Sequence, residues 1–253
     1  MSIELALTPD PRWTATAEDV ASAAATAGFG AVGLGPNQAH PAAGAALAQA
    51  GVRCHELLAL IITKDEQRTL AEAERLAQLA EQVGAQWVLV GNRLPLTAES
   101  ARVYARCAAL FAEVGSGLAL EFSPLGSAKS IDAALAIVDA VAPARAGVLI
   151  DTWHFFNGPS TWEQLQSVPL DKIAYVQFAD ALPPIGDDGF HETFSRRTWA
   201  GGGTFDLHRF ADTLRGRGWR GTVSVEMLNE QHATLPLPEF ARQAHETTAR
   251  YWR

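Results

Sequence analysis

The feature that most constrains this sequence is an alternation of short apolar runs with longer amphipathic runs, repeated eight times along the chain. The apolar runs lie at residues 3–7, 31–35, 52–61, 87–91, 117–122, 147–151, 173–181 and 221–228. Amphipathic runs follow them at residues 16–29, 40–51, 64–85, 97–115, 130–142, 161–168, 205–219 and 237–252. The apolar runs are typical of buried strands, and the apolar stripe of each longer run is typical of a helix.

This alternation predicts the fold class α/β, because parallel strands with two apolar faces need helices to cover both faces. Eight strand–helix units in 253 residues favour a single closed (β/α)8 TIM barrel over an open doubly wound sheet. No linker or shift in composition interrupts the pattern, so residues 1–253 are expected to form one TIM-barrel domain.

Charge and composition exclude two classes of partner. The chain has 28 acidic and 20 basic residues, a formal net charge of −8, only three lysines and no basic run, which argues against nucleic-acid binding. The first residues lack a basic region followed by an apolar one, and no apolar run is long enough to span a membrane. A cytoplasmic protein with no membrane partner is therefore expected.

Polar side chains end four consecutive predicted strands: Glu121, Asp151, Gln177 and Glu226. In a TIM barrel the carboxyl ends of the strands meet at one face, where the chemistry is located. Three carboxylates in a buried pocket would repel one another and take up protons unless a cation compensates them. The four residues are therefore predicted to bind a divalent metal, and their oxygen donors favour Mn²⁺ or Mg²⁺, with Co²⁺ and Zn²⁺ as alternatives.

Four further residues are candidates for contacting substrate. His154 follows Asp151 among aromatic residues, and Glu56 lies early in the third predicted strand. Arg196 and Arg197 lie in the long loop after the seventh strand, where a guanidinium can bind a carboxylate or phosphate in bidentate fashion. The alternative interpretations are a packed core histidine, a buried polar residue of the barrel and two solvated arginines.

The strand ends also resemble a known family. The segments ALEF with Glu121, LIDTWH with Asp151 and His154, VQFADA with Gln177, and VSVEML with Glu226 are similar to the xylose-isomerase-like barrel superfamily. That group contains sugar isomerases and epimerases, inosose isomerases and dehydratases, and type-IV endonuclease relatives. The resemblance implies that the four strand-end positions bind one divalent metal. It also implies that His154 contacts substrate and that the two glutamates act on opposite faces of the substrate.

The sequence departs from this family pattern in two places. The third ligand is usually histidine in the epimerases, whereas Gln177 stands here and resembles some bacterial 3-dehydroshikimate dehydratases. The segment RRTWAGGGTFDL resembles the family's Arg…Pro-Gly-Glu-Gly segment, but Ala200 and Gly202 replace the proline and the glutamate.

The expected activity is that of a metal-dependent sugar or cyclitol ketose isomerase or epimerase acting on a small polyhydroxy ketone. Its catalytic residues would be Glu121, Glu226 and His154, and a glutamate would remove the proton next to the carbonyl to give an enediolate. The alternative is a metal-dependent dehydratase (a lyase) of the 3-dehydroshikimate or inosose type. A non-catalytic barrel with a decayed site is the rival from another class, and a homodimer is left open.

Three other enzyme classes fit the residues less well. A Schiff-base aldolase needs a lysine near the carboxyl end of a strand, and Lys64, Lys129 and Lys172 do not lie there. A retaining glycosidase would use two carboxylates but would not need Asp151 and Gln177 at the same level. An endonuclease of the same superfamily would need more histidine ligands and a basic face.

Overall fold

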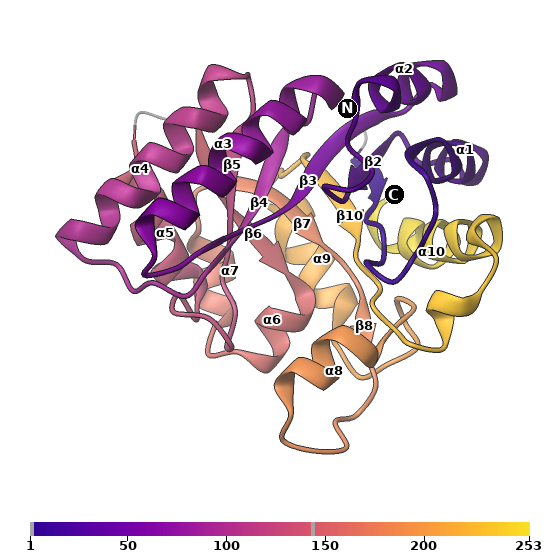
Figure 1. Ribbon diagram of the computed structural model, residues 1–253. Coiled ribbons are helices and arrows are strands. Elements are labelled where there is room, and N and C mark those ends of the chain that lie inside the picture. Colours follow the sequence, from indigo (N-terminus) through magenta and orange to yellow (C-terminus); the bar gives the residue numbers. More distant parts are fainter. Residues whose placement is uncertain (1–2, 143–144) are drawn as a thin grey trace.

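The computed structural model describes residues 3–142 and 145–253, and its centre is a closed barrel of parallel strands surrounded by helices (Figure 1). The barrel strands are β1 (Glu4–Leu7), β2 (Ala31–Leu34), β3 (Arg53–Ile62), β4 (Trp87–Asn92), β5 (Gly117–Glu121), β6 (Ala146–Asp151), β7 (Ile173–Gln177) and β10 (Thr222–Val225). They pair in chain order, and β10 closes the barrel between β7 and β1. The predicted (β/α)8 barrel is confirmed, and each predicted apolar run overlaps one of its strands, with β3, β4 and β6 each extending one residue beyond the predicted run.

Helices cover the outside of the barrel. They are α1 (Ala17–Ala27), α2 (Pro41–Ala50), α3 (Glu66–Val83), α4 (Ala98–Glu113), α5 (Ile131–Ala140), α7 (Trp162–Ser167), α9 (Leu207–Gly216) and α10 (Leu237–Trp252), with 3₁₀ turns at Leu170–Lys172 and His232–Thr234. Their apolar faces pack on the strands in one large cluster that includes Leu7, Leu34, Phe111 and Phe210. A second buried cluster, which includes Trp87, Leu149 and Tyr175, is contributed by β4 to β7.

Local chemistry fixes where many of these helices begin and end. Thr16 and Thr97 each accept a hydrogen bond from the backbone N–H three residues on, which satisfies a donor that the first turn leaves free. Gly28 and Gly51 end α1 and α2 with φ of 96° and 73°, a left-handed conformation that other residues adopt only with strain.

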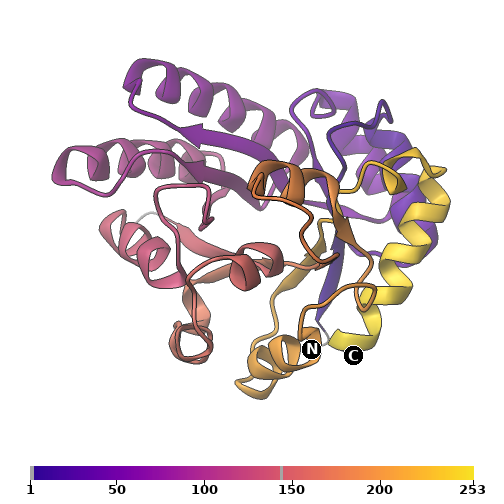
Figure 2. The ribbon, with the colours of Figure 1, turned by 90° about the horizontal axis from the view of Figure 1, so that it is seen from below.

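Two short helices lie where only loops and strand ends are predicted. The helix α6 (Thr152–Asn157) follows β6 directly, and α8 (Gly189–Ser195) lies within the loop after β7. A two-stranded antiparallel ribbon, β8 (Asp180–Ala181) with β9 (Arg197–Thr198), forms the base of that loop. Figure 2, seen from below, places α8 inside the ring of outer helices. The loop after β7 therefore folds over the barrel mouth.

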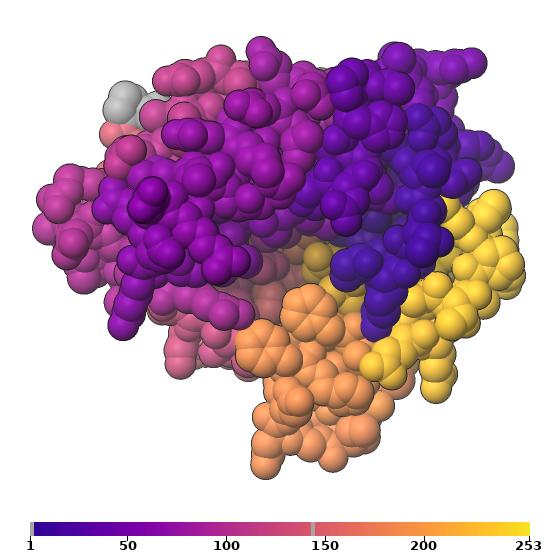
Figure 3. Space-filling view, viewed as in Figure 1, coloured from indigo at the N-terminus to yellow at the C-terminus, as the bar shows by residue number. Residues whose placement is uncertain are grey.

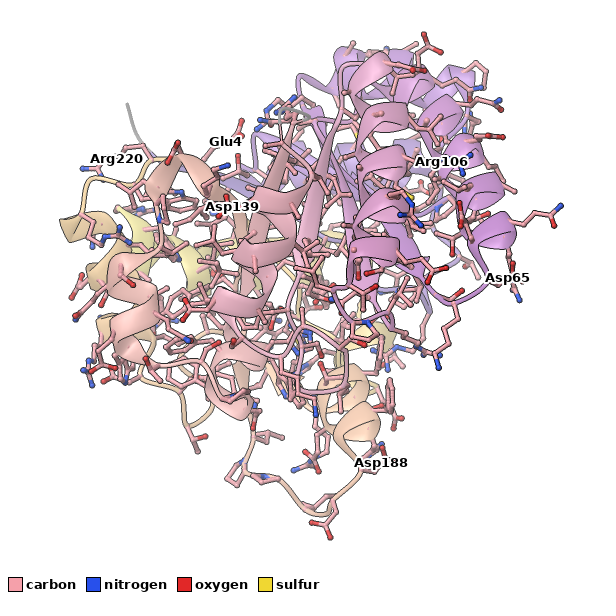
Figure 4. The ribbon with its side chains drawn as sticks, turned by 90° about the vertical axis from the view of Figure 1, so that its left-hand side faces the viewer. Glu4, Asp65, Arg106, Asp139, Asp188 and Arg220 are labelled. Atoms are coloured by element: carbon pink, nitrogen blue, oxygen red, sulfur yellow. The ribbon has the colours of Figure 1, made fainter. Side chains whose placement is uncertain are left out.

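The two ends of the barrel carry different parts of the chain. In Figure 4, Glu4 at the start of β1 lies near the top, and Asp188, the N-cap of α8, lies at the bottom. The carboxyl ends of the strands therefore face the side on which α8 lies. Among the described residues, no helix combines the length and the apolar character that crossing a membrane requires.

Candidate metal centre

Asp151, the last residue of β6, binds two different groups through its two carboxylate oxygens. Its Oδ1 accepts a hydrogen bond of 2.9 Å from the backbone N–H of His154 and so caps the first turn of α6. Its Oδ2 accepts a bond of 2.6 Å from Nη1 of Arg197. The carboxylate is fully buried, and the short helix that it starts carries His154 to the barrel mouth.

Three carboxylates converge at this mouth, as the strand ends predict. Glu121 ends β5, Asp151 ends β6 and Glu226 follows β10, and one oxygen of each lies within 4.8 Å of an oxygen of the others. The register explains the meeting, because β7 lies between β6 and β10 and pairs Gln177 with Asp151 on one side and with Ser224 on the other. Hard oxygen donors at this spacing fit a divalent cation.

The amide of Gln177 lies beside this triad. Its Nε2 is 3.3 Å from Oε1 of Glu226 and 3.3 Å from Oε2 of Glu56. Its Oε1 is buried and has no hydrogen-bond partner among the described residues. A buried carbonyl oxygen without a partner is unfavourable, so this atom is available to a ligand of the site. The donor set therefore fits the four ligands predicted from the sequence.

Arg197 brings a single positive charge to the three carboxylates. Its guanidinium is buried, with Nη1 at 2.6 Å from Oδ2 of Asp151 and at 3.1 Å from Oε2 of Glu226. Nε and Nη2 donate to the carbonyl oxygen and the hydroxyl of Thr193 on α8. The expected substrate-binding arginine is thus bound to the predicted metal ligands and to the helix above them.

Arg196, the other arginine predicted to bind substrate, is not brought into this cluster. Its Nε donates to Oε2 of Glu192 at 2.9 Å, and its Nη2 donates to the carbonyl oxygen of Pro183. Both partners belong to the loop that carries α8. Arg196 therefore holds this loop together, and its donors are directed away from the triad.

The charges at the site shift two pKa values in opposite directions. Burial raises the pKa of Glu226 well above its ordinary value; Arg197 opposes this shift, and the charges of Asp151 and Glu121 add to it. For Asp151 burial acts upward, but the ion pair with Arg197 and the neighbouring His154 bring its pKa below its ordinary value. The guanidinium therefore does not offset the effects of burial and of the neighbouring carboxylates on Glu226, and an additional cation at the site would lower its pKa.

His154, predicted from the sequence to contact substrate, lies at the edge of the triad and lines the cavity. Its Nε2 is 3.4 Å from Oε1 of Glu121, and its Nδ1 is buried without a hydrogen-bond partner among the described residues. The ring packs edge-on against Trp153. The packing expected for a core histidine and a polar contact with a site carboxylate thus occur together.

Glu56 lies deeper in the barrel than expected. It is fully buried, does not line the cavity at the mouth, and its oxygens accept hydrogen bonds from Thr8, Ser224, Tyr175 and Gln177. The expectation that Glu56 contacts substrate does not agree with this placement, because a carboxylate with four donors has no free lone pair to offer.

A cavity of about 310 Å³ opens above the triad and is visible as a hollow between α8, in orange, and the first half of the chain (Figure 3). Glu121, His154, Arg197 and Glu226 line its floor. Its walls are mainly apolar and include Leu58, Ala59, Leu89, Leu228, Phe190 and Phe194.

Several lining residues were not predicted from the sequence. Phe190 and Phe194 on α8 are half-exposed, and their rings stack with a centroid distance of 6.5 Å. Phe190 and Phe194 are four residues apart, a spacing that places both rings on one face of a helix, and Asp188 is a typical residue to begin that helix. This pattern is the sequence signal that could have identified them.

Asn92 and Arg93 also line the cavity and follow the apolar run of β4, so the strand-end rule that identifies Glu121 could have identified them too. Asn92 holds the backbone of Glu121 through a bond of 3.2 Å.

Sequence comparison finds enzymes that are similar to this chain over part of their length. The chain is 28% identical over 196 residues to the inosose isomerase of Bacillus velezensis, covering 73% of this chain and 69% of that enzyme. It is 27% identical over 180 residues to the 3-dehydroshikimate dehydratase of Pseudomonas aeruginosa, covering 67% of this chain and 27% of that enzyme. It spans about half the length (47%) of the inosose isomerase of Halalkalibacterium halodurans, which is 29% identical over 137 residues, or 53% of this chain.

Solved structures share the fold. The IOLI protein with a bound zinc atom superposes with a TM-score of 0.85 at 20% identity, covering 98% of both chains. The D-allulose 3-epimerase from Methylomonas sp. superposes with a TM-score of 0.75 at 17% identity, covering 99% of this chain and 98% of the epimerase. The family model of the xylose isomerase-like TIM barrel matches residues 2–251. With this match and the barrel that carries it, the chain belongs to the xylose isomerase-like TIM barrel family.

Proposed function

We propose that this protein is a divalent-metal-dependent isomerase or epimerase that moves a proton next to the carbonyl of a small polyhydroxy ketone. The observation that carries this proposal is the meeting of three carboxylates within 4.8 Å of one another, beside a single guanidinium and a glutamine oxygen without a partner. Glu121, Asp151, Gln177 and Glu226 would hold the ion. Their oxygen donors favour Mn²⁺ or Mg²⁺.

Bound at these residues, a divalent cation would polarise a carbonyl oxygen and thereby acidify the adjacent C–H. Glu121 and Glu226 both line the cavity, so either carboxylate is available to accept that proton, and the family resemblance implies that the two act on opposite faces of the substrate. Return of the proton to the neighbouring carbon gives an isomer, and return to the opposite face of the same carbon gives an epimer. His154, beside Glu121, would hold a substrate hydroxyl.

The relatives support an enzyme of this kind, since they include inosose isomerases, and a structural neighbour is an allulose epimerase. The zinc atom in the IOLI structure supports metal binding in this fold and keeps Zn²⁺ among the candidates. Measuring the metal content of the purified protein decides between these ions.

Dehydration is the second candidate, and specific features favour it. The cavity walls are mostly apolar, which suits a substrate with fewer hydroxyl groups than a sugar. Arg93 lies at the rim, exposed, and its guanidinium has no partner among the described residues, so it is available to a substrate carboxylate. Gln177 and the similarity to 3-dehydroshikimate dehydratases also favour dehydration. After the shared proton removal, a dehydratase would expel a hydroxyl group from the neighbouring carbon.

The test is incubation of the Mn²⁺-loaded protein in D₂O with ketoses, inososes and 3-dehydroshikimate, followed by NMR and ultraviolet absorbance. An isomerase or epimerase incorporates solvent deuterium at the carbon next to the carbonyl without a new chromophore. A dehydratase produces the absorbance of a conjugated or aromatic product. Stoichiometric metal binding with neither signal for any of these substrates would contradict the proposal and favour a non-catalytic barrel.

A further inference from the structure

Glu56 points into the barrel because β3 is irregular at this position. The pairing of β3 with β2 matches Cys54 with Val32 and Glu56 with Gly33, so His55 is an extra residue in β3. Gly33 makes room for the side chain, since a Cβ at Gly33 would lie 2.9 Å from Cγ of Glu56. A bulge and a glycine at one place are typical of a strand that must direct a particular side chain.

The carboxylate of Glu56 is held from the opposite wall of the barrel. Its Oε1 accepts hydrogen bonds from the hydroxyls of Thr8 at 2.6 Å and Ser224 at 2.7 Å. Its Oε2 accepts one from the Tyr175 hydroxyl at 2.5 Å and one from Nε2 of Gln177 at 3.3 Å. Three hydroxyls thus fix the carboxylate in position. Because the carboxylate cannot move, its contact with Nε2 restricts the orientation of the Gln177 amide.

The contact with Gln177 matters because the two ends of an amide have similar shape and opposite hydrogen-bonding character. In the observed orientation Nε2 donates toward two carboxylates, those of Glu56 and Glu226. The reversed orientation would place the amide oxygen against carboxylate oxygens and turn the NH₂ group to where Oε1 now lies. Only the observed orientation leaves the oxygen of Gln177 free for a cation.

We infer that Glu56 is a positioning residue that fixes the amide of Gln177 so that its oxygen is available to a divalent cation. The inference rests on the metal-dependent function proposed above. It replaces the expectation that Glu56 contacts substrate. Partners of metal ligands typically contribute 10–100-fold to metal affinity by orienting the ligand.

The test is a double-mutant cycle on Mn²⁺ affinity, measured by titration calorimetry of the metal-free protein without substrate. Glu56→Gln removes the obligate acceptor while keeping the size of the side chain, and we expect the Kd for Mn²⁺ to rise about 10–100-fold. In a Gln177→Leu background the same substitution should change the Kd by no more than about twofold, because Glu56 then has no amide to orient. If Glu56→Gln weakened Mn²⁺ binding equally in the unmodified protein and in Gln177→Leu, the inference would be overturned, and the weaker binding would be assigned to the lost negative charge.

Two further variants guard against misfolding and against a general structural effect. Glu56→Asp keeps the charge but shortens the reach to Gln177, so it should also weaken Mn²⁺ binding; unchanged affinity would contradict the inference. Thr8→Val removes one of the three hydroxyls that hold Glu56 but keeps the contact of Glu56 with Gln177, so it should raise the Kd clearly less than Glu56→Gln does. Losses in Thr8→Val equal to those in Glu56→Gln would indicate only a structural role.

The inference can fail separately from the proposed function. If the unmodified protein binds Mn²⁺ stoichiometrically and the cycle is additive, the positioning role is wrong and the metal-dependent function stands. If the unmodified protein binds no divalent ion, both are wrong.

Discussion

The two ends of the barrel use the same kinds of side chain with opposite outcomes. At the amino end of the strands Arg53 binds a single carboxylate, that of Glu4, and donates also to Oε1 of Gln86 at 2.6 Å. At the carboxyl end one guanidinium, that of Arg197, faces three carboxylates. The pair of Arg53 with Glu4 is balanced in charge and half-exposed, whereas the cluster around Arg197 is buried and has an excess of negative charge.

The glutamines at the two ends make the same contrast. The oxygen of Gln86 accepts a hydrogen bond from Arg53, whereas the oxygen of Gln177 accepts none among the described residues. A stabilising network pairs every group, because a buried polar atom without a partner is unfavourable. The unpaired oxygen of Gln177 is therefore available to a ligand, whereas the paired oxygen of Gln86 has a structural role.

The largest difference between the ends should appear when one carboxylate is neutralised at each. Glu226→Gln should lower kcat/KM by about 10²–10⁴-fold, because it removes both a predicted metal ligand and a candidate proton acceptor. The matched change Glu4→Gln should leave kcat/KM within about twofold, since its carboxylate is partly exposed and far from the cavity. Steady-state kinetics measures both, and similar losses in the two variants would remove the distinction between the ends.

Neutralising the two arginines tests the same contrast through stability. Arg197→Met leaves buried carboxylates without their partner, so the free energy of unfolding of the metal-free protein should fall by about 3–5 kcal/mol. Arg53→Met acts on a pair whose side chains are 41% and 35% exposed, and should lower it by about 0–1 kcal/mol. Urea unfolding followed by circular dichroism measures both. A smaller loss for Arg197→Met than for Arg53→Met would contradict this account.

The contrast also shows what the sequence can predict. Glu121, Asp151, Gln177 and Glu226 are predictable because each lies at the carboxyl end of a predicted strand, and the geometry of a parallel barrel brings such strand ends together. Strand positions and the convergence of the carboxylates depend on local hydrophobicity and on this one topological rule. This part of the fold and the site was therefore predictable.

The remainder depends on contacts between distant segments. The guanidinium of Arg197 reaches Asp151 only because β9 pairs with β8 and folds the loop back over the mouth. The partners of Glu56 come from across the barrel, and the extra residue in β3 that directs it inward has no local signature. Propensity and periodicity within one segment carry no information on such contacts.

Added metal should stabilise the carboxyl end alone. A divalent ion that binds only the folded protein should raise the free energy of unfolding by about 2.7 kcal/mol when its concentration is 100 times the Kd. Glu4→Gln should keep this increment, and Glu226→Gln should lose most of it. Thermal unfolding with Mn²⁺ or with EDTA measures the increment. An equal increment in Glu226→Gln would place the ion elsewhere in the molecule.

The expected effect with the smallest increment, taken per pH unit, is the pH dependence that the crowded carboxylates impose on the metal-free protein. Burial raises the pKa of Glu226 above its ordinary value of 4.5, so the folded state holds this proton more tightly than the unfolded state does. Its stabilising contribution is complete below that ordinary value and is lost as the pH rises through the higher, folded-state pKa. The unfolding free energy of the unmodified protein minus that of Glu226→Gln should therefore fall with rising pH, by up to about 1.4 kcal/mol per pH unit.

Saturating Mn²⁺ should abolish this pH dependence, because a metal ligand is held in its ionised form. Comparison with Glu226→Gln removes the contribution of His55, whose pKa burial lowers to about 3 and whose effect on stability is common to both proteins. Urea titrations between about pH 5 and 8, with EDTA or with Mn²⁺, supply the measurement. If this signed difference rose with pH in EDTA, the carboxyl group of Glu226 would be ionised in the metal-free fold, and Arg197 would be sufficient to balance the mouth as Arg53 balances Glu4 at the opposite end.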